Sequence, residues 1–73
     1  MLNIAQIGVG YWGPNLLRNL DANSQCTLKA VVDLSKERRN FVSSHYPNIQ
    51  TTDDIEAIIN DSDIDGIVIA TPV

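Results

Sequence analysis

The segment Gly8-Val9-Gly10-Tyr11-Trp12-Gly13 decides the fold predicted for this chain. It is a G-x-G-x-x-G motif that follows an apolar run over residues 2–7 and leads into a helical pattern, which is the order strand, tight turn, helix. Gly8 would let the chain turn off the strand, Gly10 would let a phosphate approach the main chain, and Gly13 would let the helix lie close to the strand. The motif therefore predicts a loop whose main-chain N–H groups bind a diphosphate without a basic side chain.

A second feature is Asp33, which follows the apolar run over residues 28–32 and lies twenty positions after Gly13. An acidic residue at the end of the second strand is where the adenosine ribose of a dinucleotide meets the protein, because its hydroxyls can donate to a carboxylate. The alternative is a glycine-rich turn without a ligand, with Asp33 solvated. Together the two features favour dinucleotide binding.

Apolar and helical patterns alternate along the rest of the chain. Strands are expected at residues 2–7, 27–32, 49–51 and 66–70. Helices are expected at residues 11–22, after an N-cap at Ser35, and after an N-cap at Asp53 or Thr52. The residues expected to face the sheet are Leu16, Leu17, Leu20, Phe41, Val42, Ile55, Ile58 and Ile59.

This alternation predicts an α/β fold, a Rossmann-type parallel sheet (βαβαβαβ) of strand order 3-2-1-4, as an incomplete part of a doubly wound domain. The continuous apolar run at residues 66–70 suits a strand covered on both faces. The order reverses between the first and fourth strands, so ligand should lie above their carboxyl ends. Thr71 and Pro72 would then lie where the nicotinamide half of a dinucleotide passes.

Composition excludes several classes of function. With 44% hydrophobic and 19% charged residues among 73, the chain has the composition of a soluble globular protein. A formal charge of −4 argues against a nucleic-acid partner, which needs a basic face. No apolar stretch approaches the roughly 20 residues of a membrane span, and no basic segment precedes the first apolar run, so a cytoplasmic location is expected.

Neither a catalytic residue nor a metal site is predicted within these residues. The single cysteine, Cys26, cannot form an internal disulfide, and His45 is expected to be a solvated residue at a helix end. Five aspartates flank the third helix without the spacing of a metal-binding loop, and caps and turns explain them better. They are Asp53, Asp54, Asp61, Asp63 and Asp65.

Several of these residues resemble one known family. The resemblance is carried by residues 7–15, Val32-Asp33, Arg38 and Ile69-Ala70-Thr71-Pro72. They are similar to the N-terminal part of the glucose-fructose oxidoreductase/inositol dehydrogenase (Gfo/Idh/MocA) family. The Gly-Tyr-Trp-Gly-Pro-Asn variant is most similar to members that act on nucleotide-linked sugars, such as UDP-N-acetylglucosamine 3-dehydrogenases.

The resemblance implies an NAD(P)-dependent oxidoreductase that moves hydride between nicotinamide and a sugar or polyol, and a homo-oligomer at full length. The residues that match cofactor-binding positions of the family are Gly8, Gly10, Tyr11, Trp12, Gly13, Asp33, Arg38, Ala70, Thr71 and Pro72. The family's Glu-Lys-Pro motif, whose lysine takes part in catalysis, and its substrate domain do not occur in these 73 residues. We therefore expect the chain to be the cofactor-binding part of a longer enzyme.

Asp33 favours NAD over NADP, because a carboxylate accepts hydrogen bonds from ribose hydroxyls but repels a 2′-phosphate. Arg38 or Arg39 could offset that repulsion. Two other functions stay open on the same scaffold: a nucleotide-sensing or CoA-binding regulatory module, and a methyltransferase. Trp12-Gly13-Pro14 counts against the methyltransferase, whose loop generally resembles G-x-G-x-G.

Overall fold

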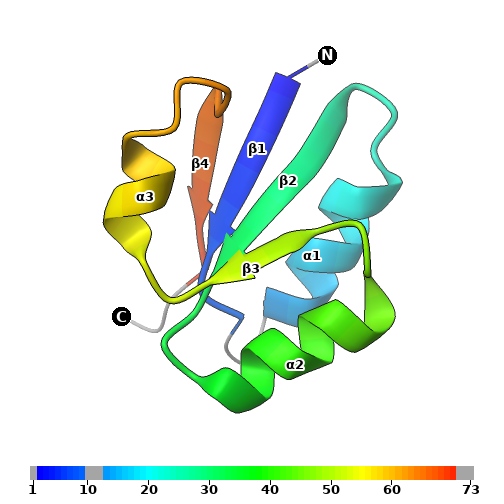
Figure 1. Ribbon diagram of the computed structural model, residues 1–73. Coiled ribbons are helices and arrows are strands. Elements are labelled where there is room, and N and C mark those ends of the chain that lie inside the picture. The colour runs from blue at the N-terminus through cyan, green and yellow to red at the C-terminus, as the bar shows by residue number, and fades with distance from the viewer. Residues whose placement is uncertain (1, 10–12, 71–73) are drawn as a thin grey trace.

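The computed structural model describes residues 2–9 and 13–70, with side chains omitted at residues 13, 14 and 16. In this part of the chain four strands alternate with three helices (Figure 1). Their bounds are β1 Leu2–Ile7, α1 Gly13–Ala22, β2 Cys26–Val32, α2 Lys36–His45, β3 Gln50–Thr52, α3 Ile55–Ile59 and β4 Gly66–Ile69. All strand pairs are parallel and the order is β3-β2-β1-β4. The predicted fold class and strand order are confirmed.

Helices cover the two faces of the sheet unequally. Helices α1 and α2 lie on one face and α3 on the other (Figure 1). Beneath α1 and α2, buried Leu17 and Val42 pack in one cluster with Val31 of β2. Beneath α3, Ile58 packs with Ala30 in a second cluster. Apolar side chains therefore line both faces of the central strands, as a parallel sheet with helices on both sides requires, and the one buried polar side chain among the described residues is Gln6 of β1.

A β-bulge in β2 shifts the alternation of its side chains. Ile4 of β1 pairs with Leu28, but the next residue, Ala5, pairs with Ala30, so Lys29 is the additional residue. As a result Leu28 belongs to the cluster under α1 and α2, whereas Ala30 belongs to the cluster under α3. The bulge leaves Lys29 outside the paired register.

Several predicted boundaries need correction. Strand β2 begins at Cys26, one residue before the predicted start, and β3 occupies Gln50–Thr52 rather than residues 49–51. The N-cap of α3 is Asp54, not Asp53 or Thr52, and its Oδ1 accepts from the N–H groups of Glu56 (3.1 Å) and Ala57 (3.3 Å). Of the first helix, residues 11 and 12 and the side chain at position 16 lie outside the described part.

Three side chains predicted to face the sheet are exposed instead. Phe41 is 38% exposed and its ring packs on His45 with centroids 4.3 Å apart, while the adjacent Val42 is fully buried. In α3, Ile55 (42%) and Ile59 (60%) are exposed and only Ile58 is buried. A helix of five residues has room for one anchoring turn, which explains why a single isoleucine packs.

Strand β4 is an edge strand with an exposed apolar face. Its Ile67 is 41% exposed and Ile69 is 69% exposed. The apolar run suits a strand covered on both faces, but the part of the chain that the structure describes leaves this face of β4 uncovered. Val68, between the two, is half-buried.

Candidate functional site

The carboxyl ends of the strands meet at a turn that only glycine adopts readily. Gly8, directly after β1, has φ of 91°, in the region where side chains are strained. Its N–H donates to Val32 O of β2 at 2.7 Å. On the other side of β1, the Ala70 N–H donates to Ile7 O at 2.8 Å. The turn after β1 therefore lies between the ends of β2 and β4, at the reversal of strand order where ligands bind in such folds.

Asp33 joins this turn to the beginning of α2. Its Oδ2 accepts from the Val9 N–H at 2.9 Å, and its Oδ1 accepts from the Ser35 N–H at 2.8 Å. The Asp33 N–H donates to Thr52 O of β3 at 3.0 Å. The carboxylate is half-buried and points to the glycine loop rather than away from the mouth of the sheet. The two halves of the predicted motif are in direct contact.

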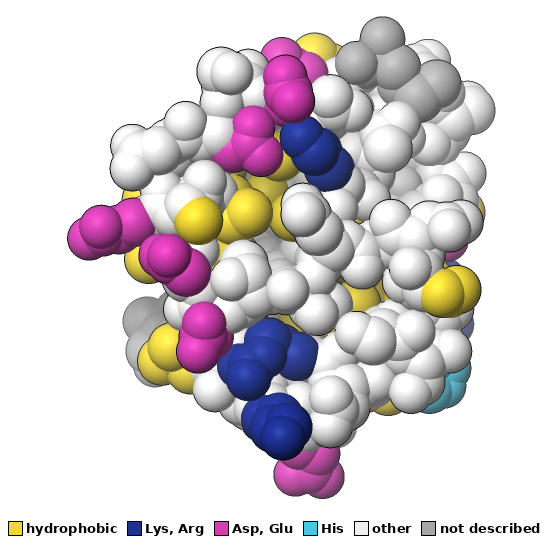
Figure 2. Space-filling view, in the orientation of Figure 1, with side chains coloured by type: hydrophobic (Ala, Val, Ile, Leu, Met, Phe, Trp, Pro, Cys, Tyr) yellow, Lys and Arg dark blue, Asp and Glu magenta, His cyan; other side chains and the backbone are white. Residues whose placement is uncertain are grey.

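The beginning of α2 is basic and well capped. Ser35 is the N-cap, as predicted, and its hydroxyl oxygen accepts from the Arg38 N–H at 3.3 Å. The Arg39 guanidinium donates through Nη1 to the carbonyl oxygen of Asp33 at 2.7 Å, whereas the Arg38 side chain is exposed. Figure 2 shows Lys and Arg side chains gathered over the beginning of α2 and acidic side chains along α3 and the loop after it.

The structure brings together the predicted residues Gly8, Asp33 and Ala70, and Gly13 begins α1. The predicted Gly10, Tyr11, Trp12, Thr71 and Pro72 lie outside the described residues. Sequence reasoning missed the main-chain contacts of Val9 and Ser35. It also placed Arg38 at the site and named Arg39 only as a possible aid to NADP. The side chains of adjacent arginines leave a helix in different directions, and the sequence did not indicate which of the two contacts Asp33.

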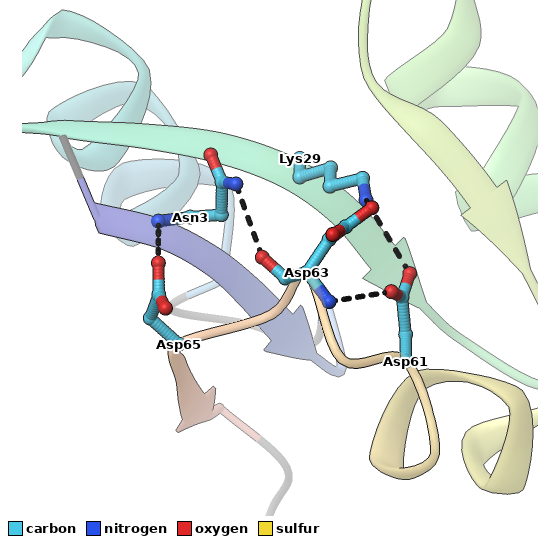
Figure 3. A network of polar contacts seen from close by, with 5 residues as sticks. All are labelled: Asn3, Lys29, Asp61, Asp63 and Asp65. Carbon is cyan, nitrogen blue, oxygen red and sulfur yellow. Dashed lines mark hydrogen bonds and ion pairs between the residues drawn. The ribbon is translucent and has the colours of Figure 1, made fainter.

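The opposite end of the sheet holds a second polar network (Figure 3). Lys29 forms ion pairs with Asp61 (3.4 Å) and Asp63 (3.3 Å). At the beginning of β1, the Asn3 N–H donates to Asp65 Oδ2 at 2.8 Å, and Asn3 Nδ2 donates to Asp63 O at 3.0 Å. These aspartates serve turns, as the sequence suggested, and Asp61 and Asp63 also form ion pairs that were not predicted.

The charges of this network shift two pKa values. The N–H of Asp63 donates to Asp61 and lowers the pKa of that carboxyl, Lys29 lowers it further, and together they outweigh partial desolvation. Partial desolvation lowers the pKa of Lys29, but hydrogen bonds and charge from Asp63 and Asp61 outweigh it and raise the pKa above its ordinary value. Both groups are therefore held in their charged forms.

The described residues contain neither a metal-binding cluster nor a membrane-spanning helix. Within residues 2–9 and 13–70, no group of three or more His, Cys, Asp or Glu side chains is arranged to hold a metal ion. In the same part of the chain, no helix has the length and apolar character needed to cross a bilayer.

The chain matches known proteins by family and by fold. Residues 2–73 match the model of the Gfo/Idh/MocA family, described as an oxidoreductase family with an NAD-binding Rossmann fold. No curated protein sequence matches the chain. The solved structures that it resembles are four to five times longer, since it spans only 20–23% of the three described next.

The first of these is scyllo-inositol dehydrogenase from Lactobacillus casei with NAD(H) and scyllo-inositol, with TM-score 0.85, 18% identity, and coverage of 99% of this chain and 22% of that one. The second is GenD2 of gentamicin A biosynthesis with NAD, with TM-score 0.87, 24% identity, and coverage of 99% and 20%. The third is a variant of KijD10, a 3-ketoreductase from Actinomadura kijaniata, with TDP-benzene and NADP, with TM-score 0.83, 15% identity, and coverage of 97% and 23%. At these identities the likeness establishes the fold.

Proposed function

Because the chain belongs to the Gfo/Idh/MocA oxidoreductase family and carries its NAD-binding Rossmann fold, we propose that it is the N-terminal, cofactor-binding part of a longer dehydrogenase. The full-length enzyme transfers hydride between nicotinamide and a hydroxyl-bearing carbon of a sugar or nucleotide-linked sugar. Within these 73 residues the proposed role is to hold the cofactor. The catalytic residues and the substrate domain would follow Val73, and the enzyme would act in the cytoplasm as a homo-oligomer.

The observation that carries this proposal is the hydrogen bond between Asp33 Oδ2 and the Val9 N–H. It places the acid at the end of β2 directly beside the turn after β1, so a diphosphate on the loop and the adjoining ribose at Asp33 would be neighbours. The Val9 N–H is already used by Asp33. The diphosphate would therefore be bound by N–H groups later in the loop, from Gly10 to Gly13, at the beginning of α1.

The preference for NAD follows from the chemistry of Asp33. A carboxylate can accept about four hydrogen bonds, and two of these are made within the protein. The remaining capacity suits two ribose hydroxyls, whereas a 2′-phosphate would be repelled. The basic residues at the beginning of α2, Lys36, Arg38 and Arg39, would moderate that repulsion, so the preference is one of degree.

The nicotinamide half is assigned to the end of β4. The Ala70 N–H donates to Ile7 O, which fixes the end of this strand beside the glycine turn. Ala70, Thr71 and Pro72 would pass the nicotinamide ribose, while Tyr11 and Trp12 would contact the diphosphate through their main chain. The resemblance of residues 10–15 to enzymes of nucleotide-linked sugars supports a substrate of that class.

The test is to titrate the full-length protein with NAD and NADP and to follow absorbance of reduced nicotinamide with a panel of polyols, sugars and nucleotide-linked sugars. We expect NAD to bind and at least one substrate class to be oxidised. We also expect Asp33→Ala to weaken NAD more than NADP, since only NAD presents both hydroxyls to the carboxylate. Equal losses for the two cofactors would contradict the ribose assignment, and NAD binding without turnover of any substrate would favour a regulatory module.

A further inference from the structure

We propose that Asp33 is also a positioning residue, whose carboxylate fixes the glycine loop independently of any contact with the ribose. This inference rests on the proposed function, since it concerns the same cofactor. The established family pattern explains why an acid at this position meets a ribose. It does not explain why both oxygens of Asp33 accept hydrogen bonds from the main chain of two different segments.

The surroundings of Asp33 fix the carboxylate from several directions. The main-chain N–H of Asp33 donates to Thr52 O at 3.0 Å, which attaches the residue to β3. Its carbonyl oxygen accepts from Arg39 Nη1 at 2.7 Å, which attaches it to α2. The side chain then reaches Val9 and Ser35. Because the main chain of Asp33 is fixed by Thr52 and Arg39, which lie outside the glycine loop, its carboxylate can in turn fix the loop.

The glycine loop contacts Asp33 at Val9, directly after the turn at Gly8. Gly8 has a positive φ and is attached to β2 by its N–H, while the Val9 side chain is 3% exposed and packs in the core under α1. The hydrogen bond from the Val9 N–H to Asp33 Oδ2 adds a side-chain contact at the residue directly after this turn. We infer that it fixes the main chain at Val9, from which the loop continues.

Asp54 offers a matched control within the same chain. It is also an aspartate that follows a strand and accepts two main-chain N–H groups, from Glu56 and Ala57. Those bonds stay within its own helix, however, and do not reach the glycine loop. Asp54→Ala also removes a carboxylate that accepts two main-chain N–H groups, so it reports the cost of losing such bonds without a change at Val9.

The experiment is a double-mutant-type cycle on the full-length enzyme, in which a substitution in the protein is combined with the removal of hydroxyls from the ligand. Dissociation constants are measured for NAD and for an NAD analogue that lacks both hydroxyls of the adenosine ribose, with the wild type, Asp33→Ala, Asp33→Asn and Asp54→Ala. Hydrogen exchange of the peptide containing Val9 is measured in the same four proteins without cofactor. If Asp33 only bound the ribose, its substitution would weaken the binding of NAD alone. If it positions the loop, its substitution weakens the binding of both NAD and the analogue.

We expect Asp33→Ala to weaken binding of the analogue without ribose hydroxyls about tenfold or more, which is the effect of losing one charge-assisted hydrogen bond. Binding of NAD should be weakened further. Asp33→Asn, which keeps one acceptor oxygen, should recover part of the loss for the analogue. Exchange at Val9 should be faster in Asp33→Ala and unchanged in Asp54→Ala.

Unchanged affinity of Asp33→Ala for the analogue would overturn the positioning role and leave the proposed function intact. An equal loss in Asp54→Ala would also overturn it, because the effect would then come from stability alone. If the wild type binds neither NAD nor the analogue, the proposed function itself is wrong. The two failures are therefore distinguishable.

Discussion

The two ends of the parallel sheet use similar side chains in different ways. At the carboxyl end, one carboxylate, Asp33, accepts hydrogen bonds from the main chain of two segments, next to a glycine with positive φ. At the amino end, Asp61, Asp63 and Asp65 lie near Lys29 and Asn3 in exposed turns (Figure 3). Asp33 contacts the glycine turn and the beginning of α2, whereas the aspartates of the amino end contact Lys29, Asn3 and their own turn.

The difference shows that the number of acidic residues does not indicate a binding site. The three aspartates at the amino end accept from the Lys29 ammonium and from main-chain N–H groups in exposed turns, and these contacts account for their chemistry. The single acid at the carboxyl end is half-buried, and its two oxygens accept from the main-chain N–H groups of Val9 and Ser35 beside a glycine with positive φ. A half-buried carboxylate whose two oxygens both accept from the main chain beside such a turn is the better signal.

The largest effect is expected from a change at Gly8. Its φ of 91° means that Gly8→Ala should cost about 1 to 3 kcal/mol of stability and should abolish NAD binding by redirecting the loop. The measurements are chemical denaturation and an NAD titration of the full-length protein.

Gly66→Ala is the control at the amino end of the sheet. A Cβ at Gly66 would lie 3.1 Å from Ile4 Cδ1, the flexible end of a side chain, so a small shift should accommodate it. We expect a modest loss of stability and unchanged NAD affinity. NAD binding lost equally in both variants would remove the distinction between the two ends.

A smaller effect is expected from Lys29→Met, which removes both ion pairs and keeps the apolar stem. Exposed ion pairs contribute little because water and salt screen them. The melting temperature should fall by much less than in Gly8→Ala, and NAD affinity should be unchanged. Added salt should reduce the difference from the wild type, and a salt-independent loss would mean that Lys29 stabilises the bulge by packing instead.

Much of the fold was predictable because local signals agreed with one another. The strand, glycine turn and helix at the N-terminus, the N-cap Ser35 and the order 3-2-1-4 all followed from alternation and turn chemistry. The bulge at Lys29 was not predictable, since pairing with β1 decides which residue is additional. Likewise Phe41 and Val42 are adjacent apolar residues, and only the packed helix shows which one is buried.

The candidate site was predictable in part for the same reason. Gly8 and Asp33 carry sequence signals of their own, a motif and a spacing. The contacts of Val9 and Ser35 use main-chain N–H groups, which every residue except proline has, so no residue type announces them. The N-cap of α3 was misplaced because Thr52, Asp53 and Asp54 are all good caps, and the strand end determines which one is used.

The last and smallest effect concerns pH and the amino end alone. The pKa of Asp61 is lowered from 3.8, so its charge contributes stability that is present above that value and is lost as the pH falls through the pKa of the folded protein. The pKa of Lys29 is raised from 10.5, so its contribution is present below that value and is lost as the pH rises through the pKa of the folded protein. The network should therefore stabilise the fold across the neutral range.

Asp61→Asn tests this, because the amide keeps an oxygen that can accept from the Asp63 N–H but loses both the charge and the acceptor for Lys29 Nζ. Its deficit in unfolding free energy relative to the wild type should be small at pH 7 and should vanish as the pH falls through the lowered pKa of the carboxyl in the folded protein. Asp21→Asn, on the exposed side of α1, controls for the change in net charge. A deficit that persists in acid would assign the role of Asp61 to its hydrogen bonds and not to its charge. The NAD affinity at pH 7 should be the same in all three proteins, because this end of the sheet does not reach the glycine loop.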